Sequence, residues 1–178
     1  MGLTRFIFCN LMGWHIKGSF DQNIKKAVVI VVPHTSWHDF YVGAFARRIL
    51  KTQINFIGKK ELFKPPFGWY FKWMGGVPLD RTPGQKKVAT IAKIFEDKEE
   101  FRLALSPEGT RKKVENWKTG FYYIAKSANV PIIPVGFDYK TKTVTVGNAY
   151  YPKGTIEEDL KQLKLQFINV VGKRVERT

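Results

Sequence analysis

The six residues AVVIVV at positions 27–32 constrain the fold of this chain more than any other segment. The run is apolar throughout and mostly β-branched, without the polar residues that alternate in a strand exposed on one face. A strand of this composition must be covered on both faces, which is typical of an inner strand in a parallel sheet. Because helices supply that cover, the run predicts an α/β protein.

The remainder of the sequence alternates between strand-like and helix-like segments, as an α/β fold requires. Further strands are predicted at 54–57, 77–79, 101–105, 132–137 and 142–146. Helices are predicted at 37–51, 66–74, 83–98, 120–128 and 155–171. We expect a single domain at residues 27–178, with a mostly parallel or mixed β-sheet flanked by helices, preceded by an apolar and basic membrane-contact segment at 1–26.

Charge and aromatic content indicate an anionic partner. The 178 residues include 30 Lys and Arg against 15 Asp and Glu, a net charge of +15, and 15% of the chain is aromatic. This composition suits a membrane surface with acidic lipids or a nucleic acid. Because no helix-turn-helix, zinc-finger or RNP-like motif is present, we expect a membrane and no nucleic acid. A basic membrane- or nucleic-acid-binding protein without catalysis is the alternative.

Two segments combine apolar residues with lysine or arginine, as peripheral membrane proteins do. The first contains Leu3, Phe6, Ile7, Phe8, Leu11, Met12 and Trp14. The second contains Phe63, Phe67, Trp69, Tyr70, Phe71 and Trp73 among Lys59, Lys60, Lys64 and Lys72. The alternative for the second segment is that its aromatic side chains are core. No segment reaches the roughly 18–20 consecutive apolar residues of a membrane span, so we expect a cytoplasmic protein that is peripheral on the inner face of the membrane.

The strand at 27–32 leads into the segment PHTSWHDF, in which His34 and Asp39 form an HxxxxD pattern. On one continuous helix the two side chains would point about 140° apart. They can meet if His34 lies in the loop and Asp39 in the first helical turn, with Ser36 as the N-cap. Asp39 would then orient one imidazole nitrogen while the other accepts a proton from a substrate hydroxyl. The alternative is that Asp39 only caps the helix.

Two further loops follow predicted strands and carry an arginine. SPEGTR contains Glu108 and Gly109 and ends in Arg111, and GVPLDR ends in Arg81. A guanidinium suits a phosphate or carboxylate, and glycine permits close approach of a ligand to the backbone. Each loop alone is also typical of an ordinary turn with a solvated charge. Because ligands bind at the carboxyl ends of strands in open α/β sheets, the loops together predict one site.

The segments HTSWHD, GKKELF with GGVPLDR, LSPEGTR and VPIIPVG resemble, in order and approximate spacing, the four motif blocks of the glycerolipid acyltransferases. They are most similar to the 1-acyl-sn-glycerol-3-phosphate (lysophosphatidate) acyltransferase branch, over residues 27–137. Pro33 and Ser106 stand where members commonly carry Asn and Phe, which leaves the choice of acceptor open.

The resemblance implies an O-acyltransferase of phospholipid biosynthesis that moves a fatty acyl group from acyl-CoA or acyl carrier protein to a hydroxyl of a lysolipid acceptor. By default the acceptor is 1-acylglycerol-3-phosphate. His34 would be the general base and Asp39 its orienting partner, with neither a metal nor a cofactor. The acceptor's phosphate and glycerol region would be held by Arg81, Glu108, Gly109, Thr110 and Arg111. A relative that binds lipid without catalysis is a further alternative, against which the intact His34 and Asp39 argue.

Overall fold

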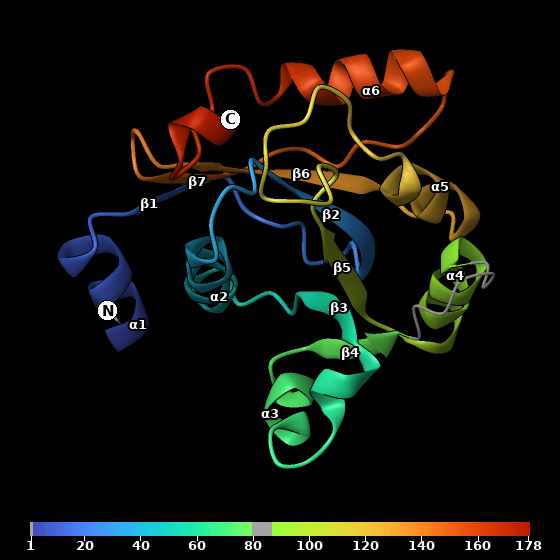
Figure 1. The fold of residues 1–178 in the computed structure, drawn as a ribbon, viewed down its shortest axis with the longest axis horizontal. Coiled ribbons are helices and arrows are strands. Elements are labelled where there is room, and N and C mark those ends of the chain that lie inside the picture. The colour runs from blue at the N-terminus through green and yellow to red at the C-terminus, as the bar shows by residue number, and fades with distance from the viewer. Residues whose placement is uncertain (1, 80–86) are drawn as a thin grey trace.

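The apolar run at 27–32 belongs to the central strand of a mixed sheet in the computed structural model, which describes residues 2–79 and 87–178 (Figure 1). The described strands are β1 (His15–Lys17), β2 (Lys26–Val32), β3 (Asn55–Lys59), β4 (Gly76–Leu79), β5 (Phe101–Leu105), β6 (Ile132–Asp138) and β7 (Thr143–Val146). Their order is β1-β7-β6-β2-β5-β3-β4, and all neighbours are parallel except β6 and β7. The predicted α/β class with a mixed sheet is confirmed.

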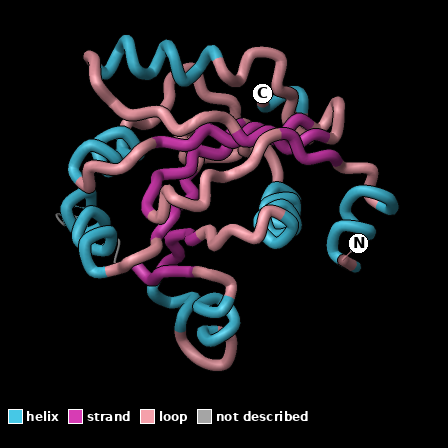
Figure 2. Tube along the Cα trace, turned by 180° about the vertical axis from the view of Figure 1, so that it is seen from behind, coloured by secondary structure: helices cyan, strands magenta, loops and turns pink. Residues whose placement is uncertain are grey.

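Helices cover both faces of this sheet. The described helices are α1 (Leu3–Arg5) with its π-helical continuation η1 (Phe6–Leu11), α2 (His38–Ile49), η2 (Lys60–Phe63), α3 (Gly68–Trp73), α4 (Lys87–Asp97), α5 (Gly120–Ser127), α6 (Ile156–Leu165) and η3 (Val175–Arg177). Figure 1 shows α4, α5 and α6 on one side of the twisted sheet and α2 on the other. Figure 2 shows from behind that α3 projects beyond the β3–β4 end of the sheet.

Most predicted boundaries lie within two residues of the observed ones. The last helix ends at Leu165 rather than at 171. It could not continue to 171, because Asn169 adopts a left-handed conformation (φ 69°) that a continuous α-helix does not allow. The predicted start of the helix at 83–98 lies outside the described residues. The short strand β1 was not predicted, since three residues give too little periodicity to recognise.

The central strand β2 is buried on both faces, as its sequence predicts. Val28 and Ile30 belong to one hydrophobic core, which includes residues of α4, α5 and α6. Ala27 and Val29 belong to a second core, which includes residues of α2 and the N-terminal segment. The two cores sit on opposite sides of the sheet because successive side chains of a strand alternate in direction.

The N-terminal segment is partly built into the second core. Phe8 is fully buried and stacks on Trp14 and on Phe45 of α2, with ring centroids 5.8 and 5.7 Å apart. The prediction that Phe8 and Trp14 contact a membrane is therefore wrong, because both side chains are buried in the core. Leu3, Phe6 and Leu11 of the same segment are exposed.

The parallel pairing of β6, β2 and β5 brings three loops to one edge of the sheet. In this register Val32 lies beside Gly136, and Ile30 lies beside Leu105. The residues that follow these strands, including His34 and Tyr139, therefore leave the sheet at the same edge. That edge is where open α/β sheets bind their ligands.

The helix α6 is held against the domain by Asp159, which is buried in its first turn. Its carboxylate accepts the hydroxyl of Tyr122 at 3.0 Å and that of Tyr150 at 2.5 Å. Burial and the bond to Asp159 raise the pKa of Tyr150 to about 12, so this hydroxyl stays protonated at neutral pH. The carboxylate thus links α6 to α5 and to the segment beside β6.

We expect Asp159→Ala to lower the free energy of unfolding by about 3 kcal/mol, because two tyrosine hydroxyls lose a charged acceptor. Urea denaturation of the variant and the wild type measures this difference. The matched control is Glu157→Ala, which removes an exposed carboxylate from the same turn and should cost less than about 0.5 kcal/mol. Equal losses in the two variants would contradict the account.

Candidate active site

His34 and Asp39 meet in the way that the HxxxxD spacing predicts. His34 lies in the loop after β2, and Asp39 lies in the first turn of α2. The Nδ1 of His34 is 2.9 Å from the Oδ2 of Asp39. Because an ionised carboxylate can only accept, the Nδ1–H group donates this hydrogen bond. The other ring nitrogen, Nε2, is left as an acceptor. The His34 side chain is 28% exposed, so substrate can reach it.

The Asp39 carboxylate is nearly inaccessible to solvent, with 3% of the residue exposed. It also accepts the backbone N–H of Ser36 at 2.9 Å and the hydroxyl of Tyr139 at 2.7 Å. Burial raises the pKa of Asp39, but the hydrogen bonds from His34, Ser36 and Tyr139 outweigh burial and lower this pKa below its usual value. Asp39 is therefore ionised when His34 is neutral.

The N-cap of α2 is Trp37, one residue later than the predicted Ser36, and the Trp37 side chain makes no capping bond. Asp39 accepts the N–H of Ser36, and the Ser36 hydroxyl accepts the N–H of His38 at 3.3 Å. The same hydroxyl lies 3.0 Å from Nδ1 of His38, whose ring packs on Trp37. His38 is thus a local hydrogen-bond partner, and Asp39 serves both as a cap and as the partner of His34.

Glu108 of the SPEGTR loop contacts the backbone of the His34 loop. Its Oε2 accepts the backbone N–H of His34 at 2.9 Å, and the residue is 8% exposed. Burial raises the pKa of Glu108, while the hydrogen bond from His34 opposes the shift. Within the described residues Glu108 forms no ion pair with Arg111. The carboxylate thus fixes the backbone of His34.

Of the other predicted binding residues, only Arg111 is among the described residues that line the cavity beside His34. Arg111 is exposed and lines the same cavity as His34. Thr110 is half-buried and accepts the N–H of Lys112. Gly109 has a φ of 64°, in the left-handed region that favours glycine. Arg81 lies outside the described residues.

A cavity of about 590 Å³ extends from His34 between α2 and the sheet. This volume falls within the range of ligand pockets, about 300–1,000 Å³. Its walls are mostly apolar and include Val29, Val31, Gly43, Ala44, Phe137 and Val146. Ser106 lies in its lining, and the Ser106 Oγ is buried without a hydrogen-bond partner among the described residues.

A second hollow of about 1080 Å³ lies on the outer side of α2, between α2 and α3. Its described lining includes the aromatic rings of Tyr41 and Trp73 and the cationic groups of Arg48, Lys51 and Lys72, and contains no carboxylate. Phe40, Ala44, Arg47, Asn55 and Met74 line both hollows. This second hollow, the outer groove, therefore adjoins the cavity beside His34, the inner cavity.

Within residues 2–79 and 87–178, no three His, Cys, Asp or Glu side chains are grouped so as to hold a metal ion. In the same part of the chain, no helix combines the length and the apolarity needed to cross a bilayer.

The family model described as Acyltransferase matches residues 15–138, a span that contains the His34 loop, α2 and the SPEGTR loop. This chain belongs to the acyltransferase family. The resemblance seen in its four motif segments is thereby confirmed. The match begins at β1 and ends at the last residue of β6.

Individual members of the acyltransferase family are similar in sequence to this chain. The chain is 32% identical over 136 residues to a 1-acyl-sn-glycerol-3-phosphate acyltransferase of Streptococcus pneumoniae, covering 71% of this chain and 50% of that protein. It is 38% identical over 121 residues to a protein of the same name from Haemophilus influenzae, covering 65% and 49%. The chain thus spans about half the length of the curated relatives it matches.

The fold is shared with a solved acyltransferase. The crystal structure of the 1-acyl-sn-glycerophosphate acyltransferase PlsC from Thermotoga maritima is similar to this chain with a TM-score of 0.64 and 22% identity. The similarity covers 92% of this chain and 73% of that chain. The likeness confirms the α/β fold.

Sequence reasoning missed Tyr139 and the C-terminal tail. Tyr139 contacts Asp39 across 100 positions of sequence, and no local pattern marks that pairing. In the tail, the N–H of Arg174 donates to the hydroxyl of the buried Thr35 at 3.2 Å, which braces the His34 loop. The structure places Tyr139 near the site through the parallel pairing of β2 with β6, which the sequence alone does not specify.

We expect Glu108→Ala to lower the free energy of unfolding by about 1–2 kcal/mol, because the N–H of His34 loses its acceptor. Glu108→Gln keeps an acceptor oxygen and should stay close to the wild type. Because burial raises the pKa of Glu108, the wild type should lose stability relative to Glu108→Gln as the pH rises from about 4, the pKa range of an unfolded Glu.

Urea denaturation of the three proteins at pH 4 and pH 7 measures both effects. If the stability of the wild type relative to Glu108→Gln stays constant or rises between pH 4 and pH 7, the buried carboxylate described above is contradicted.

Proposed function

We propose that this chain transfers a fatty acyl group from a thioester donor, acyl-CoA or acyl carrier protein, to a hydroxyl of a lysophospholipid. The default acceptor is 1-acylglycerol-3-phosphate, which matches the names of the relatives. The observation that carries the proposal is the His34–Asp39 pair at the mouth of an apolar cavity. The family membership supplies the reaction class.

In the proposed reaction His34 acts as a general base. Its Nε2 removes the proton from the acceptor hydroxyl while the oxygen attacks the thioester carbonyl. The tetrahedral intermediate then expels the thiolate, which takes the proton back from the imidazolium, so that an ester and a free thiol result. Asp39 stabilises the imidazolium and holds its orientation. Base catalysis of this kind contributes on the order of 10²–10⁴-fold in rate.

The groups around His34 suit the two substrates. Arg111 offers a charged fork for the acceptor's phosphate, and Arg81 has the same proposed role. The apolar cavity between α2 and the sheet would take an acyl chain, whose burial releases water from both surfaces. The unpartnered hydroxyl of Ser106 is available to donate to a substrate oxygen at the mouth of this cavity.

Lipid substrates require contact with a bilayer, and we assign that contact to an aromatic ridge formed by Phe67, Trp69, Tyr70 and Trp73 of α3 and its N-terminus. All four side chains are exposed, Trp69 by 71%. Such rings favour the interface between headgroups and acyl chains. The ridge borders the outer groove between α2 and α3, and this groove adjoins the inner cavity.

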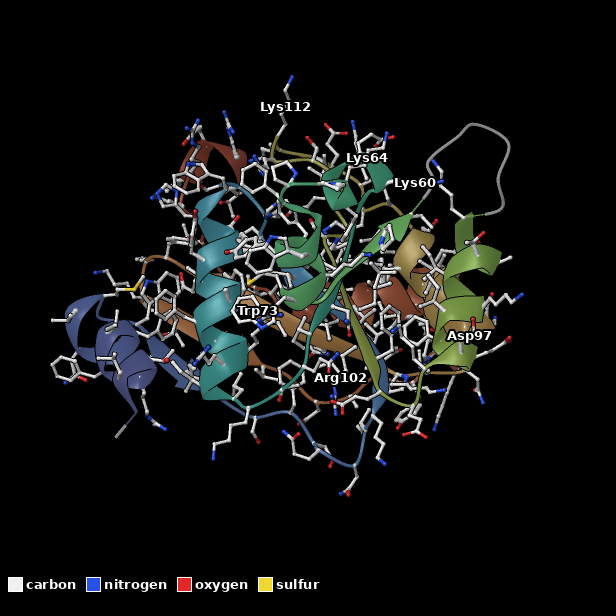
Figure 3. The ribbon with its side chains drawn as sticks, turned by 90° about the horizontal axis from the view of Figure 1, so that it is seen from below. Lys60, Lys64, Trp73, Asp97, Arg102 and Lys112 are labelled. Carbon is white, nitrogen blue, oxygen red and sulfur yellow. The ribbon has the colours of Figure 1, made fainter. Side chains whose placement is uncertain are left out.

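Lysines toward the edge of the candidate site favour an anionic surface. Figure 3 shows Lys60, Lys64 and Lys112 toward one edge of the molecule, while Arg102, at the start of β5, lies toward the opposite edge. The three lysines therefore lie toward the edge at which β5 ends, the same edge as the candidate site. Each basic group near an anionic membrane contributes about 1 kcal/mol. The proposed location is the surface of an anionic bilayer.

His34→Ala should abolish acyl transfer, with a loss of at least about 10²-fold, because no other group in the proposed mechanism accepts the hydroxyl proton. The measurement is thiol release from long-chain acyl-CoA in the presence of 1-acylglycerol-3-phosphate, repeated with acyl carrier protein as donor. His38→Ala is the matched control, since His38 is a neighbouring histidine without a contact to Asp39, and it should keep most of the activity. Wild-type turnover in His34→Ala would overturn the mechanism.

Trp69→Ala should weaken binding to vesicles of phosphatidylcholine and phosphatidylglycerol on the order of tenfold, because an interfacial anchor is lost. Co-sedimentation with the vesicles measures the affinity. Tyr151→Ala is the matched control and should bind as the wild type does. Tyr151 is also exposed, and it follows Tyr150, which pairs with Ile132 at the opposite edge of the sheet. Equal binding by all three proteins would exclude α3 as the contact.

A further inference from the structure

We propose that Tyr139 is a positioning residue of the candidate active site, acting through Asp39 to hold His34 in its catalytic orientation. The inference rests on the proposed acyl transfer and adds a residue to its machinery. It is carried by the contacts of the Asp39 carboxylate, whose two oxygens have different partners.

The two carboxylate oxygens of Asp39 divide the available donors between them. Oδ2 accepts from Nδ1 of His34 and from the N–H of Ser36, each at 2.9 Å. Oδ1 accepts from the hydroxyl of Tyr139 at 2.7 Å, its only hydrogen bond to a described residue. Without that hydroxyl, Oδ1 would be a buried anionic oxygen with no protein donor, which is costly. Tyr139 therefore fixes the plane of the carboxylate, and the carboxylate fixes the ring of His34.

Tyr139 is itself held by three separate parts of the fold. It directly follows β6, whose pairing with β2 places it beside the His34 loop. Its backbone N–H donates to the carbonyl of Val171 at 2.8 Å. Its ring meets the buried Trp14 edge to face, with centroids 4.9 Å apart. A side chain restrained at its backbone and at its ring can hold the carboxylate in one orientation.

The hydroxyl of Tyr139 acts as a donor throughout the working pH range. Burial and the hydrogen bond to Asp39 both raise the pKa of Tyr139 well above its ordinary value. Asp39 is the charged group that acts on this hydroxyl. His34 lowers the pKa of Asp39, and the charge of Asp39 raises the pKa of Glu108. The bond from Tyr139 also draws negative charge away from the side of the carboxylate that faces His34.

The test is Tyr139→Phe, which removes only the hydroxyl. We expect kcat to fall about tenfold, because the general base is less well oriented, while KM for donor and acceptor changes less than about twofold. The acid limb of the kcat profile should move to higher pH, because a carboxylate with fewer donors stabilises the imidazolium more strongly.

Tyr150→Phe is the matched control. Tyr150 also donates its hydroxyl to a buried carboxylate, that of Asp159, but this pair has no contact with His34. The control variant should keep the kcat and the pH profile of the wild type. If both variants lose activity alike, or if Tyr139→Phe changes KM and leaves the pH profile unmoved, the hydroxyl is merely structural and the inference is wrong.

A second measurement separates this inference from the proposed function. The ¹⁵N resonances of the His34 imidazole should change at a higher pH in Tyr139→Phe than in the wild type, with the exposed His15 as an internal reference. This shift is expected whether or not a donor and acceptor for turnover have been found. Wild-type protein that transfers no acyl group would overturn the proposed function, whereas unchanged His34 resonances would overturn the role of Tyr139.

Discussion

The arrangement of the candidate site depends on the buried negative charge of Asp39. A carboxylate removed from water must be surrounded by donors if it is to remain ionised. Here the donors come from the loop after β2, from the start of α2 and from the residue after β6. Only a sheet in which β2 and β6 are parallel neighbours brings these segments together. The central apolar strand therefore does more than stabilise the core, because its pairing with β6 also brings Tyr139 to the His34–Asp39 pair.

The remaining features of the molecule are consistent with a lipid substrate. The sheet is covered by α2 on one face, and the small residues Gly43 and Ala44 of this helix line the apolar cavity beside it. That cavity begins at His34 and adjoins a groove with aromatic and cationic lining that contains no described carboxylate. An amphiphile with an anionic headgroup matches both surfaces, since its chain requires an apolar cavity and its headgroup a positive one. In the proposed function, the exposed aromatic ridge on α3 is the contact through which such a molecule enters from the bilayer.

Much of this organisation could be predicted from the sequence because it is encoded locally. The run at 27–32 was sufficient to predict a strand buried on both faces, and the spacing of His34 and Asp39 was sufficient to predict a loop-to-helix pair. The role of Glu108 toward the His34 backbone and the contact of Tyr139 with Asp39 could not be predicted, since each joins residues more than 70 positions apart. The burial of Phe8 and Trp14 was also missed. An apolar stretch that packs on α2 has the same composition as one that enters a membrane.

The central claim is that the acceptor hydroxyl, activated by His34, attacks the donor thioester directly. Intact-protein mass spectrometry and thiol release, measured with acyl-CoA or acylated carrier protein before and after 1-acylglycerol-3-phosphate is added, test this claim most directly. The account predicts no acylated protein and no thiol release without acceptor, followed by equal amounts of thiol and ester when acceptor is present. A burst of thiol equal to the protein concentration, with an acyl adduct on the chain before acceptor is added, would contradict it.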